Sequence, residues 1–258
     1  MNRRQFLGTA AGVLIATPHL FENPGGGGDS IGLQLSTVRD AFARDPEGTL
    51  AAVAGVGYRD VELYELHGPA GWPAPRLRGA LDRSGVVARA VRVPTPLLYR
   101  GLERHAEVAA ALGCTYLVCS HLDPDERRAL RDWHELAAVF NRAGETARRA
   151  GVRVAYASRD YDVATVDGQV PRDILLAETD PSLVWFELDA RIGDAAADLA
   201  AHRGRVFALT VGERVDARVL AAARDAGVER VFVEIDNPPS PSIDSARRAY
   251  VALRQLRS

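Results

Sequence analysis

The chain of 258 residues contains no lysine, so every cationic side chain is an arginine or a histidine. Chemistry that needs a Schiff-base or general-base lysine is therefore excluded. No excess of either charge stands out, because the formal net charge is -2. This balance argues against nucleic acid or an anionic membrane surface as a partner. A content of 47% hydrophobic and 26% charged residues is typical of one large globular domain.

Cysteine is scarce as well. Cys114 and Cys119 lie five positions apart in an apolar run, and no further ligands stand near them at the spacing of a zinc site. We therefore expect two small core residues rather than a disulfide or a metal pair.

The first thirty residues lack the long uninterrupted apolar run of a membrane-spanning helix. Instead Arg3 and Arg4 precede "QFL" and a moderately apolar run without a polar face. This pattern is similar to a twin-arginine export signal, whose pathway carries folded proteins. The stretch "ENPGGGGDS" then reads as a flexible linker. We predict a signal and Gly-rich linker over 1–29, a domain over 30–258, export to the periplasm or the exterior, and no stable membrane anchor after processing.

From residue 31 onward the sequence repeats one unit, in which a short apolar strand, a polar loop, an Ala/Leu/Arg helix and a helix-ending glycine follow one another. These glycines are Gly57, Gly85, Gly113, Gly151, Gly204 and Gly227. The strands are "IGLQLS", "DVELYE", "VVARAVRV", "TYLVCS", "VRVAYA", "LVWFELD", "RVFALTV" and "RVFVEID". Near-continuous apolar strands are typical of parallel sheets buried on both faces.

Eight such units predict an α/β protein with a single (β/α)8 TIM-barrel domain. The alternative is a doubly wound open sheet, which would want a Gly-rich phosphate turn after the first strand. The segment "LQLSTVRDAF" has no such turn. Two helices show clear signals: Asp45 caps one with Pro46 at its first position, and a longer one is expected over about 124–150.

Polar side chains stand where these strands end, and barrel chemistry gathers at that end. Converging carboxylates repel one another unless a cation or shared protons intervene. We expect substrate contacts from Gln34, Glu62, His67, Arg92, His121 and Arg159, and an acidic cluster from Asp162, Asp189 and Glu234.

Several segments carry a family resemblance, namely "IGLQLSTVRD", "DPEGTLAAVAGVGYRDVELYELHG", "NRAGETARRAGVRVAY", "LLAETDPSLVWFELD" and "VFVEIDN". Over nearly its whole mature length the chain resembles the sugar phosphate isomerase/epimerase group, which has xylose isomerase-like barrels. In that family Glu, Asp, His and Glu hold a divalent metal, and the two glutamates move a proton beside a sugar carbonyl. The resemblance implies that Asp162, Asp189 and Glu234 are metal ligands and that Asp162 and Glu234 are catalytic.

The sequence also departs from the family pattern. Both histidines of the fifth strand end are missing from "ASRDYD", Thr210 replaces the ligand histidine, and Arg92 stands where a third-strand histidine is expected. One interpretation keeps Mn²⁺ or Mg²⁺ on the carboxylates with waters completing the shell. The other has no metal, and Arg159 or Arg92 bridges Asp189 and Glu234.

Three functions follow from these observations. The first is an exported isomerase or epimerase acting on a sugar or keto-sugar, with its metal site partly lost. The second is a non-catalytic barrel that binds a carbohydrate or a partner. The third is metal-free acid/base chemistry by a carboxylate pair beside Arg159, with the pKa of one carboxyl raised.

Overall fold

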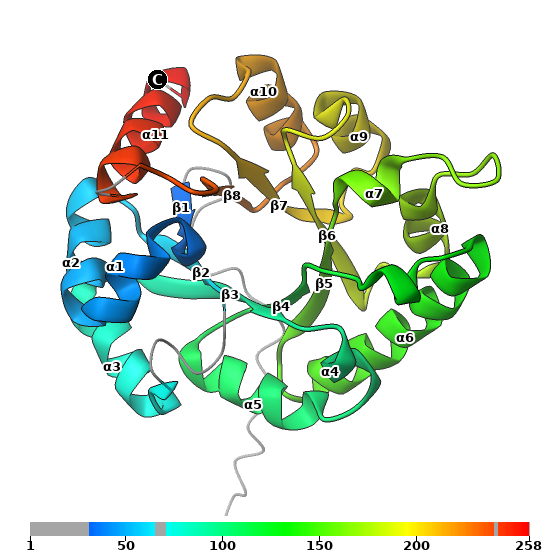
Figure 1. The fold of residues 1–258 in the computed structure, drawn as a ribbon, viewed down its shortest axis with the longest axis horizontal. Helices are drawn as coiled ribbons and strands as arrows, with labels where there is room; N and C mark the ends of the chain where they lie inside the picture. The colour runs from blue at the N-terminus through cyan, green and yellow to red at the C-terminus, as the bar shows by residue number, and fades with distance from the viewer. Residues whose placement is uncertain (1–30, 65–70, 240–241, 258) are drawn as a thin grey trace, which may run out of the picture.

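A computed structural model describes residues 31–64, 71–239 and 242–257, and they form a closed barrel of eight parallel strands (Figure 1). Each strand pairs with the next along the chain, and the first pairs with the last. The predicted single-domain (β/α)8 barrel is confirmed, and the open-sheet alternative is wrong. The strands are β1 (Ile31–Gln34), β2 (Asp60–Leu63), β3 (Val87–Val93), β4 (Tyr116–Cys119), β5 (Arg153–Ala157), β6 (Val184–Asp189), β7 (Val206–Val211) and β8 (Arg230–Val233).

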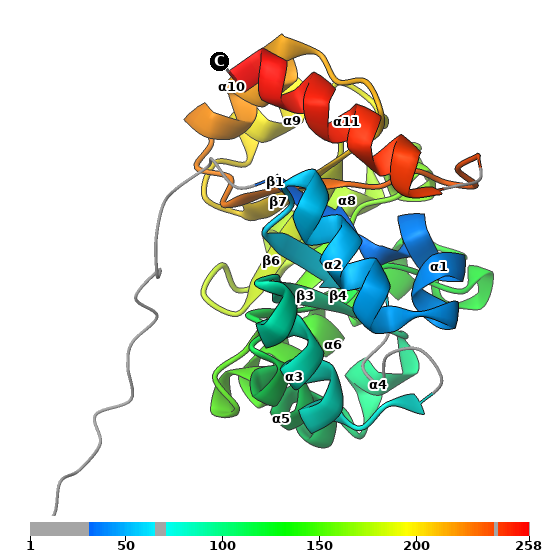
Figure 2. The same cartoon turned by 90° about the vertical axis from the view of Figure 1, so that its left-hand side faces the viewer.

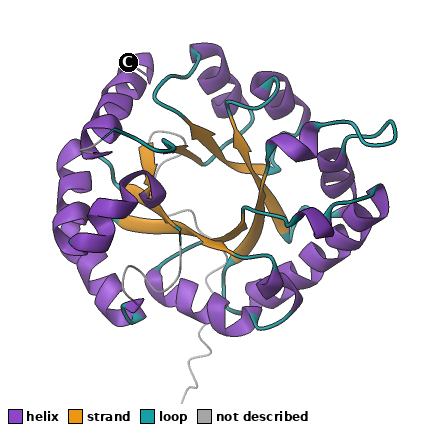
Figure 3. Ribbon diagram, viewed as in Figure 1, coloured by secondary structure: helices purple, strands orange, loops and turns teal. Residues whose placement is uncertain are grey.

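A ring of helices surrounds the barrel, and one helix of this ring follows each strand (Figure 3). These helices are α2 (Pro46–Val56), α3 (Ala74–Ser84), α5 (Leu102–Leu112), α6 (Leu130–Arg149), α8 (Pro171–Glu178), α9 (Ala195–Ala201), α10 (Ala217–Asp225) and α11 (Ser242–Arg257). The predicted signal and linker over 1–29 lie outside the described residues. None of the described helices is long and apolar enough to cross a membrane.

Short helices occupy several of the loops that follow the strands. They are η1 (Leu35–Val38), α1 (Arg39–Arg44), α4 (Pro96–Tyr99), η3 (Pro124–Glu126) and α7 (Asp160–Val163). In Figure 2, α1 and α4 lie at the same end of the barrel, because both follow the carboxyl ends of parallel strands. These loops build the mouth of the barrel.

Local sequence signals explain where the helices begin and end. The Asp45 side chain accepts a hydrogen bond from the Gly48 amide, with Pro46 at the first helical position of α2. Gly113 ends α5 with φ of +86°, in the left-handed region that a side chain disfavours. The expected long helix begins six residues later than predicted, because 124–126 form a separate 3₁₀ turn.

The apolar core has two parts. The larger part lies between the strands and the outer helices, and both cysteines are free and buried, as predicted. The smaller part fills the barrel interior, where the rings of Tyr116 and Phe207 stack with centroids 3.8 Å apart and Trp185 packs against them. This apolar plug leaves the polar strand ends to form a separate layer at the mouth.

Candidate functional site

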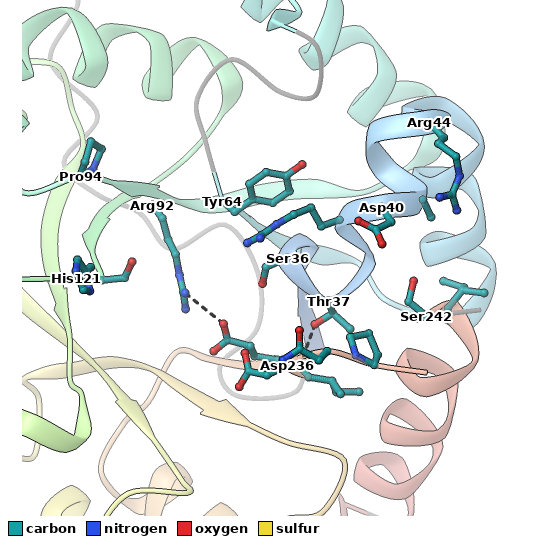
Figure 4. A pocket seen from close by; sticks show the side chains of 18 of the residues that line it. Ser36, Thr37, Asp40, Arg44, Tyr64, Arg92, Pro94, His121, Asp236 and Ser242 are labelled. Atoms are coloured by element: carbon teal, nitrogen blue, oxygen red, sulfur yellow. Dashed lines mark hydrogen bonds and ion pairs between the residues drawn. The ribbon is translucent and has the colours of Figure 1, made fainter. Parts of the chain in front are cut away.

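A cleft of about 900 Å³ opens at the barrel mouth (Figure 4). Its size suits a small-molecule ligand, for which sites of roughly 300–1,000 Å³ are usual. The loops after β1, β3, β4, β5 and β8 contribute to its lining. Four of the predicted site residues line it, namely Arg92, His121, Arg159 and Glu234. His67 lies outside the described residues.

A buried polar layer lies at the level of the strand ends. Gln34, Glu62 and Glu187 are each at most 2% exposed, and they come from β1, β2 and β6. Among the described residues, five atoms of this layer have no hydrogen-bond partner: Gln34 Nε2, both Glu62 carboxylate oxygens, Glu187 Oε2 and Arg92 Nε. Buried polar atoms without partners are costly, so this layer lowers the stability of the fold.

Arg92 joins this buried layer to the cleft. Its Nε lies 3.5 Å from Glu62 Oε1, and its Nη1 lies 3.2 Å from Glu234 Oε1. Figure 4 shows the Arg92 side chain pointing across the mouth, and its Nη1 donates to Glu234 Oε1. Burial lowers the pKa of Arg92, but the charges of Glu62, Glu187 and Glu234 more than reverse this and raise it above its ordinary value. The guanidinium is therefore a fixed positive charge.

The carboxyl groups of this layer have raised pKa values. Burial and then the charge of Glu187 raise the pKa of Glu62 to about 8, against the lowering effect of Arg92. Burial also raises the pKa of Glu187, whose carboxylate accepts a hydrogen bond from Thr210. Glu62 thus carries its proton at neutral pH.

Arg191, which was not predicted as a site residue, bridges the acidic residues of the mouth. Its Nε lies 2.8 Å from Asp189 Oδ1, and its Nη2 lies 2.6 Å from Asp189 Oδ2. The same guanidinium reaches Glu234 Oε2 at 3.4 Å and Asp236 Oδ2 at 3.1 Å. The predicted bridge between Asp189 and Glu234 therefore exists, but Arg191 makes it. Arg92 contacts only Glu234 of this pair, and Arg159 contacts neither.

Asp162 is placed differently from the prediction. Its carboxylate is fully buried in α7 and accepts hydrogen bonds from Tyr156 Oη at 2.7 Å, Ser158 Oγ at 2.8 Å and the Arg159 amide at 2.7 Å. Burial raises the pKa of Asp162, and this effect is larger than the lowering by the three hydrogen bonds. These contacts fix the turn between β5 and α7, so the role of the carboxylate is structural.

The predicted metal set of Asp162, Asp189 and Glu234 is not assembled. Over the described ranges, no three His, Cys, Asp or Glu side chains are grouped so that they could hold a metal ion. The physical reasons are that Asp162 is turned into its own loop and that Arg191 occupies the other two carboxylates. The residues present do not fit the Mn²⁺ or Mg²⁺ site that the resemblance implied.

The remaining predicted contacts lie around the cleft or below it. The His121 side chain is 68% exposed at the cleft wall, with Nε2 3.3 Å from Asp123 Oδ1. Arg159 donates from Nε to the Ser120 carbonyl at 2.7 Å, which holds its guanidinium at the mouth. Gln34 and Glu62 are buried below the cleft and do not line it. They can act on a ligand only through the side chains above them.

The arginines of the mouth that were not predicted have one feature in common. Arg191 and the cleft residues Arg39 and Arg44 lie in loops or on a short helix, where no periodic pattern marks their direction. One signal was present for Arg191: it stands two residues after Asp189, within reach of a strand end that carries excess negative charge.

The sequence matches no protein-family model. No curated protein matches it significantly either. The fold, however, matches solved structures closely. A sugar phosphate isomerase/epimerase from Parabacteroides distasonis is 19% identical, with a TM-score of 0.80 over 90% of this chain and 95% of that one.

Two epimerases have the same fold. The 3-keto-D-glucoside 4-epimerase of E. coli is 16% identical, with a TM-score of 0.68 over 88% of this chain and 98% of that one. The D-allulose 3-epimerase of Methylomonas sp., in complex with D-allulose, is 16% identical, with a TM-score of 0.67 over 88% and 96%. At these identities the similarity establishes the fold alone, a (β/α)8 barrel that this chain shares with these proteins.

Proposed function

We propose that the protein is isomerase/epimerase-like and binds a sugar or keto-sugar in the cleft at the barrel mouth. The observation that carries this proposal is the pairing of Arg92 with Glu234 at the cleft wall, with 3.2 Å between Nη1 and Oε1. A guanidinium next to a carboxylate is suited to a polyol or carbonyl ligand, because one donates and the other accepts. The neighbours that act on sugars share the fold and support this choice.

The same pair can move a proton without a metal. Arg92 donates to the carbonyl oxygen of a keto-sugar, and Glu234 takes the proton from the adjacent carbon. The electron pair of the broken C–H bond forms the enediolate double bond, and the negative charge develops on the oxygen beside Arg92. Return of the proton from Glu234 to the same carbon regenerates the substrate, whereas a proton delivered by water to the other face of that carbon gives an epimer. Return to the neighbouring carbon, with a proton shift between the oxygens, gives an isomer.

The positive charge of the cleft favours one class of sugar. Arg39, Arg44 and Arg159 line it, and no ion pair joins any of them to a described residue. Asp40 is the opposing charge on α1, while Glu234 is already paired with arginine. A guanidinium binds a carboxylate or phosphate in a fork, so we propose that acidic sugars such as uronates bind more tightly than neutral ones.

A non-catalytic sugar-binding barrel is the second candidate, and one observation favours it. Both carboxylate oxygens of Glu234 are held in ion pairs, Oε1 by Arg92 and Oε2 by Arg191. A carboxylate held this way must leave a guanidinium before it can accept a proton. Binding without turnover would then be the outcome.

Calorimetric titration of neutral and acidic sugars, followed by NMR of each bound sugar in D₂O, tests both candidates. Saturable binding with solvent deuterium entering the carbon next to the carbonyl supports the isomerase/epimerase-like function. Binding without exchange supports the second candidate. Glu234→Gln should abolish exchange, whereas Glu213→Gln, in an exposed ion pair with Arg248, should not. Failure of every sugar to bind would contradict both.

We also propose that residues 1–29 direct the folded domain out of the cytoplasm by the twin-arginine pathway. The support is sequence alone, namely Arg3 and Arg4 before a moderately apolar run. Replacing both arginines by lysine should leave the full-length protein in the cytoplasm, as measured by fractionation. Unchanged export of this variant would exclude the pathway.

A further inference from the structure

We propose that Arg191 is a built-in cation: its guanidinium holds together the carboxylates that would otherwise need a divalent metal, and its removal would expose a latent Mn²⁺ site. This proposal concerns how the mouth is assembled. It does not depend on whether the cleft binds a sugar.

The carboxylates need a positive charge because they are close and mostly shielded from water. Asp189 is 9% exposed at the end of β6, and Glu234 is 5% exposed just after β8. Asp236, at the rim, joins them through the same guanidinium. Like charges in such surroundings must be neutralised by a cation or by protons.

Arg191 supplies this charge with well-formed geometry. Its contact with Asp189 is a fork, with 2.8 Å from Nε to Oδ1 and 2.6 Å from Nη2 to Oδ2. Nη2 also reaches Glu234 Oε2 at 3.4 Å, and Nη1 reaches Asp236 Oδ2 at 3.1 Å. One guanidinium thus links two strand ends, as a metal ion shared by their carboxylates would.

The backbone holds the Arg191 side chain in this position. The Arg191 amide donates to Asp189 Oδ1 at 2.9 Å, and the Ile192 amide donates to the Asp189 carbonyl at 3.1 Å. The Ala190 amide is tied to the Thr210 carbonyl of β7 at 2.8 Å. Backbone hydrogen bonds therefore hold this loop against Asp189 independently of the guanidinium contacts. This pre-organisation lowers the entropy cost of the ion pairs.

Arg92 contacts the other carboxylate oxygen of Glu234. Its Nη1 lies 3.2 Å from Oε1, while Arg191 Nη2 contacts Oε2. A Mg²⁺ ion needs oxygen ligands at roughly 2.0–2.1 Å in a near-octahedral shell, and Mn²⁺ takes the same kind of ligand. With Arg191 in place, the oxygens that face the shared space are already used. With Arg191 removed, Asp189, Glu234 and Asp236 keep their oxygens at the mouth and lose their cation.

The experiment is a Mn²⁺ titration of the full chain, by calorimetry and by the loss of the free-ion EPR signal. The wild type should bind Mn²⁺ only weakly, at well below one equivalent. Arg191→Ala should bind close to one equivalent, with an affinity about tenfold or more above that of the wild type, because a unit charge has been removed from the carboxylates. The control Arg218→Ala removes an exposed arginine that pairs with Asp194 and should behave like the wild type.

A second variant shows where the gained ion binds. In Arg191→Ala/Asp189→Asn the gained affinity should be lost. A melting temperature that Mn²⁺ raises in Arg191→Ala but not in the wild type would support the same conclusion. If Arg191→Ala folds only when Mn²⁺ is present, the latent site is also supported.

Three results would overturn the proposal. One is stoichiometric Mn²⁺ binding by the wild type that Asp189→Asn abolishes. Another is an Arg191→Ala protein that is folded and binds no more Mn²⁺ than Arg218→Ala. The third is an Arg191→Ala protein that Mn²⁺ fails to rescue when it does not fold on its own.

Discussion

Glu62 of β2 and Arg92 of β3 lie next to each other inside the barrel, with 3.5 Å between Oε1 and Nε. The Glu62 side chain is inaccessible to water and that of Arg92 is 14% exposed. Because Arg92 also contacts Glu234 at the cleft, this one side chain couples the buried polar layer to the candidate site.

Replacing Arg92 by leucine should destabilise the fold by about 3–5 kcal/mol, because it leaves buried carboxyl groups without their cation. The free energy of unfolding in urea measures this loss. Arg83→Ala, which breaks an exposed ion pair with Glu47, should cost less than about 1 kcal/mol. A leucine variant as stable as Arg83→Ala would show that Arg92 is not needed to balance the layer.

Glu62 should make stability depend on pH. Its ordinary pKa is 4.5, and in the fold it is about 8. Between these values the native state binds more protons than the unfolded chain, so the free energy of unfolding falls as pH rises toward 8 and then levels off. Glu62→Gln, a neutral mimic of the protonated form, should therefore gain stability relative to wild type from pH 5 to pH 8.

Urea denaturation at a series of pH values measures this difference, and Glu103→Gln on α5 is the exposed control. A Glu62→Gln protein whose stability runs parallel to that of the wild type across the series would show that Glu62 is ionised in the fold.

Two helical glycines should respond in opposite directions to alanine. A Cβ at Gly144 of α6 would lie 2.7 Å from the Leu183 carbonyl oxygen, which is backbone and cannot easily move. Gly144→Ala should cost about 1–3 kcal/mol through overpacking. Gly55 of α2 has nothing within 4 Å of the same position, so Gly55→Ala should gain about 0.5–1 kcal/mol.

Melting temperatures of the two alanine variants, measured side by side, test this pair. Equal shifts in the same direction would mean that the contact with Leu183 does not limit the space at Gly144.

Asp162 should behave as a structural residue. Asp162→Ala leaves the donors of Tyr156, Ser158 and the Arg159 amide without an acceptor, so stability should fall by about 2–4 kcal/mol. Asp162→Asn keeps one acceptor oxygen and should lose less. If both variants stay folded but lose sugar exchange to the same extent as Glu234→Gln, then Asp162 is catalytic as the family resemblance implied.

The fold was readable because each unit of the barrel repeats its signals. The predicted strand segments each contain the observed strand, and Asp216 caps α10 by accepting from the Arg218 amide. Such features depend on neighbours in sequence, so composition and spacing reveal them.

The site was harder to predict, because its contacts join residues distant in sequence. Arg92 was correctly placed at the mouth, since strand ends converge there in any barrel. The loop conformation that turns Arg191 back onto Asp189 has no periodic signal, and neither does the inward turn of Asp162. The family resemblance implied that Asp162 is a metal ligand because of its position in the sequence. In the fold, three local hydrogen bonds determine where its carboxylate points.

The fork between Arg191 and Asp189 changes how the charge at the mouth responds to its surroundings. A bound metal dissociates on dilution, competes with other ions and is removed by chelators. A guanidinium carried by the chain does none of these, and it stays charged at every pH at which the protein is folded. Because Arg191 is part of the chain, every molecule carries the cation of its mouth from synthesis onward, independently of the ions around it.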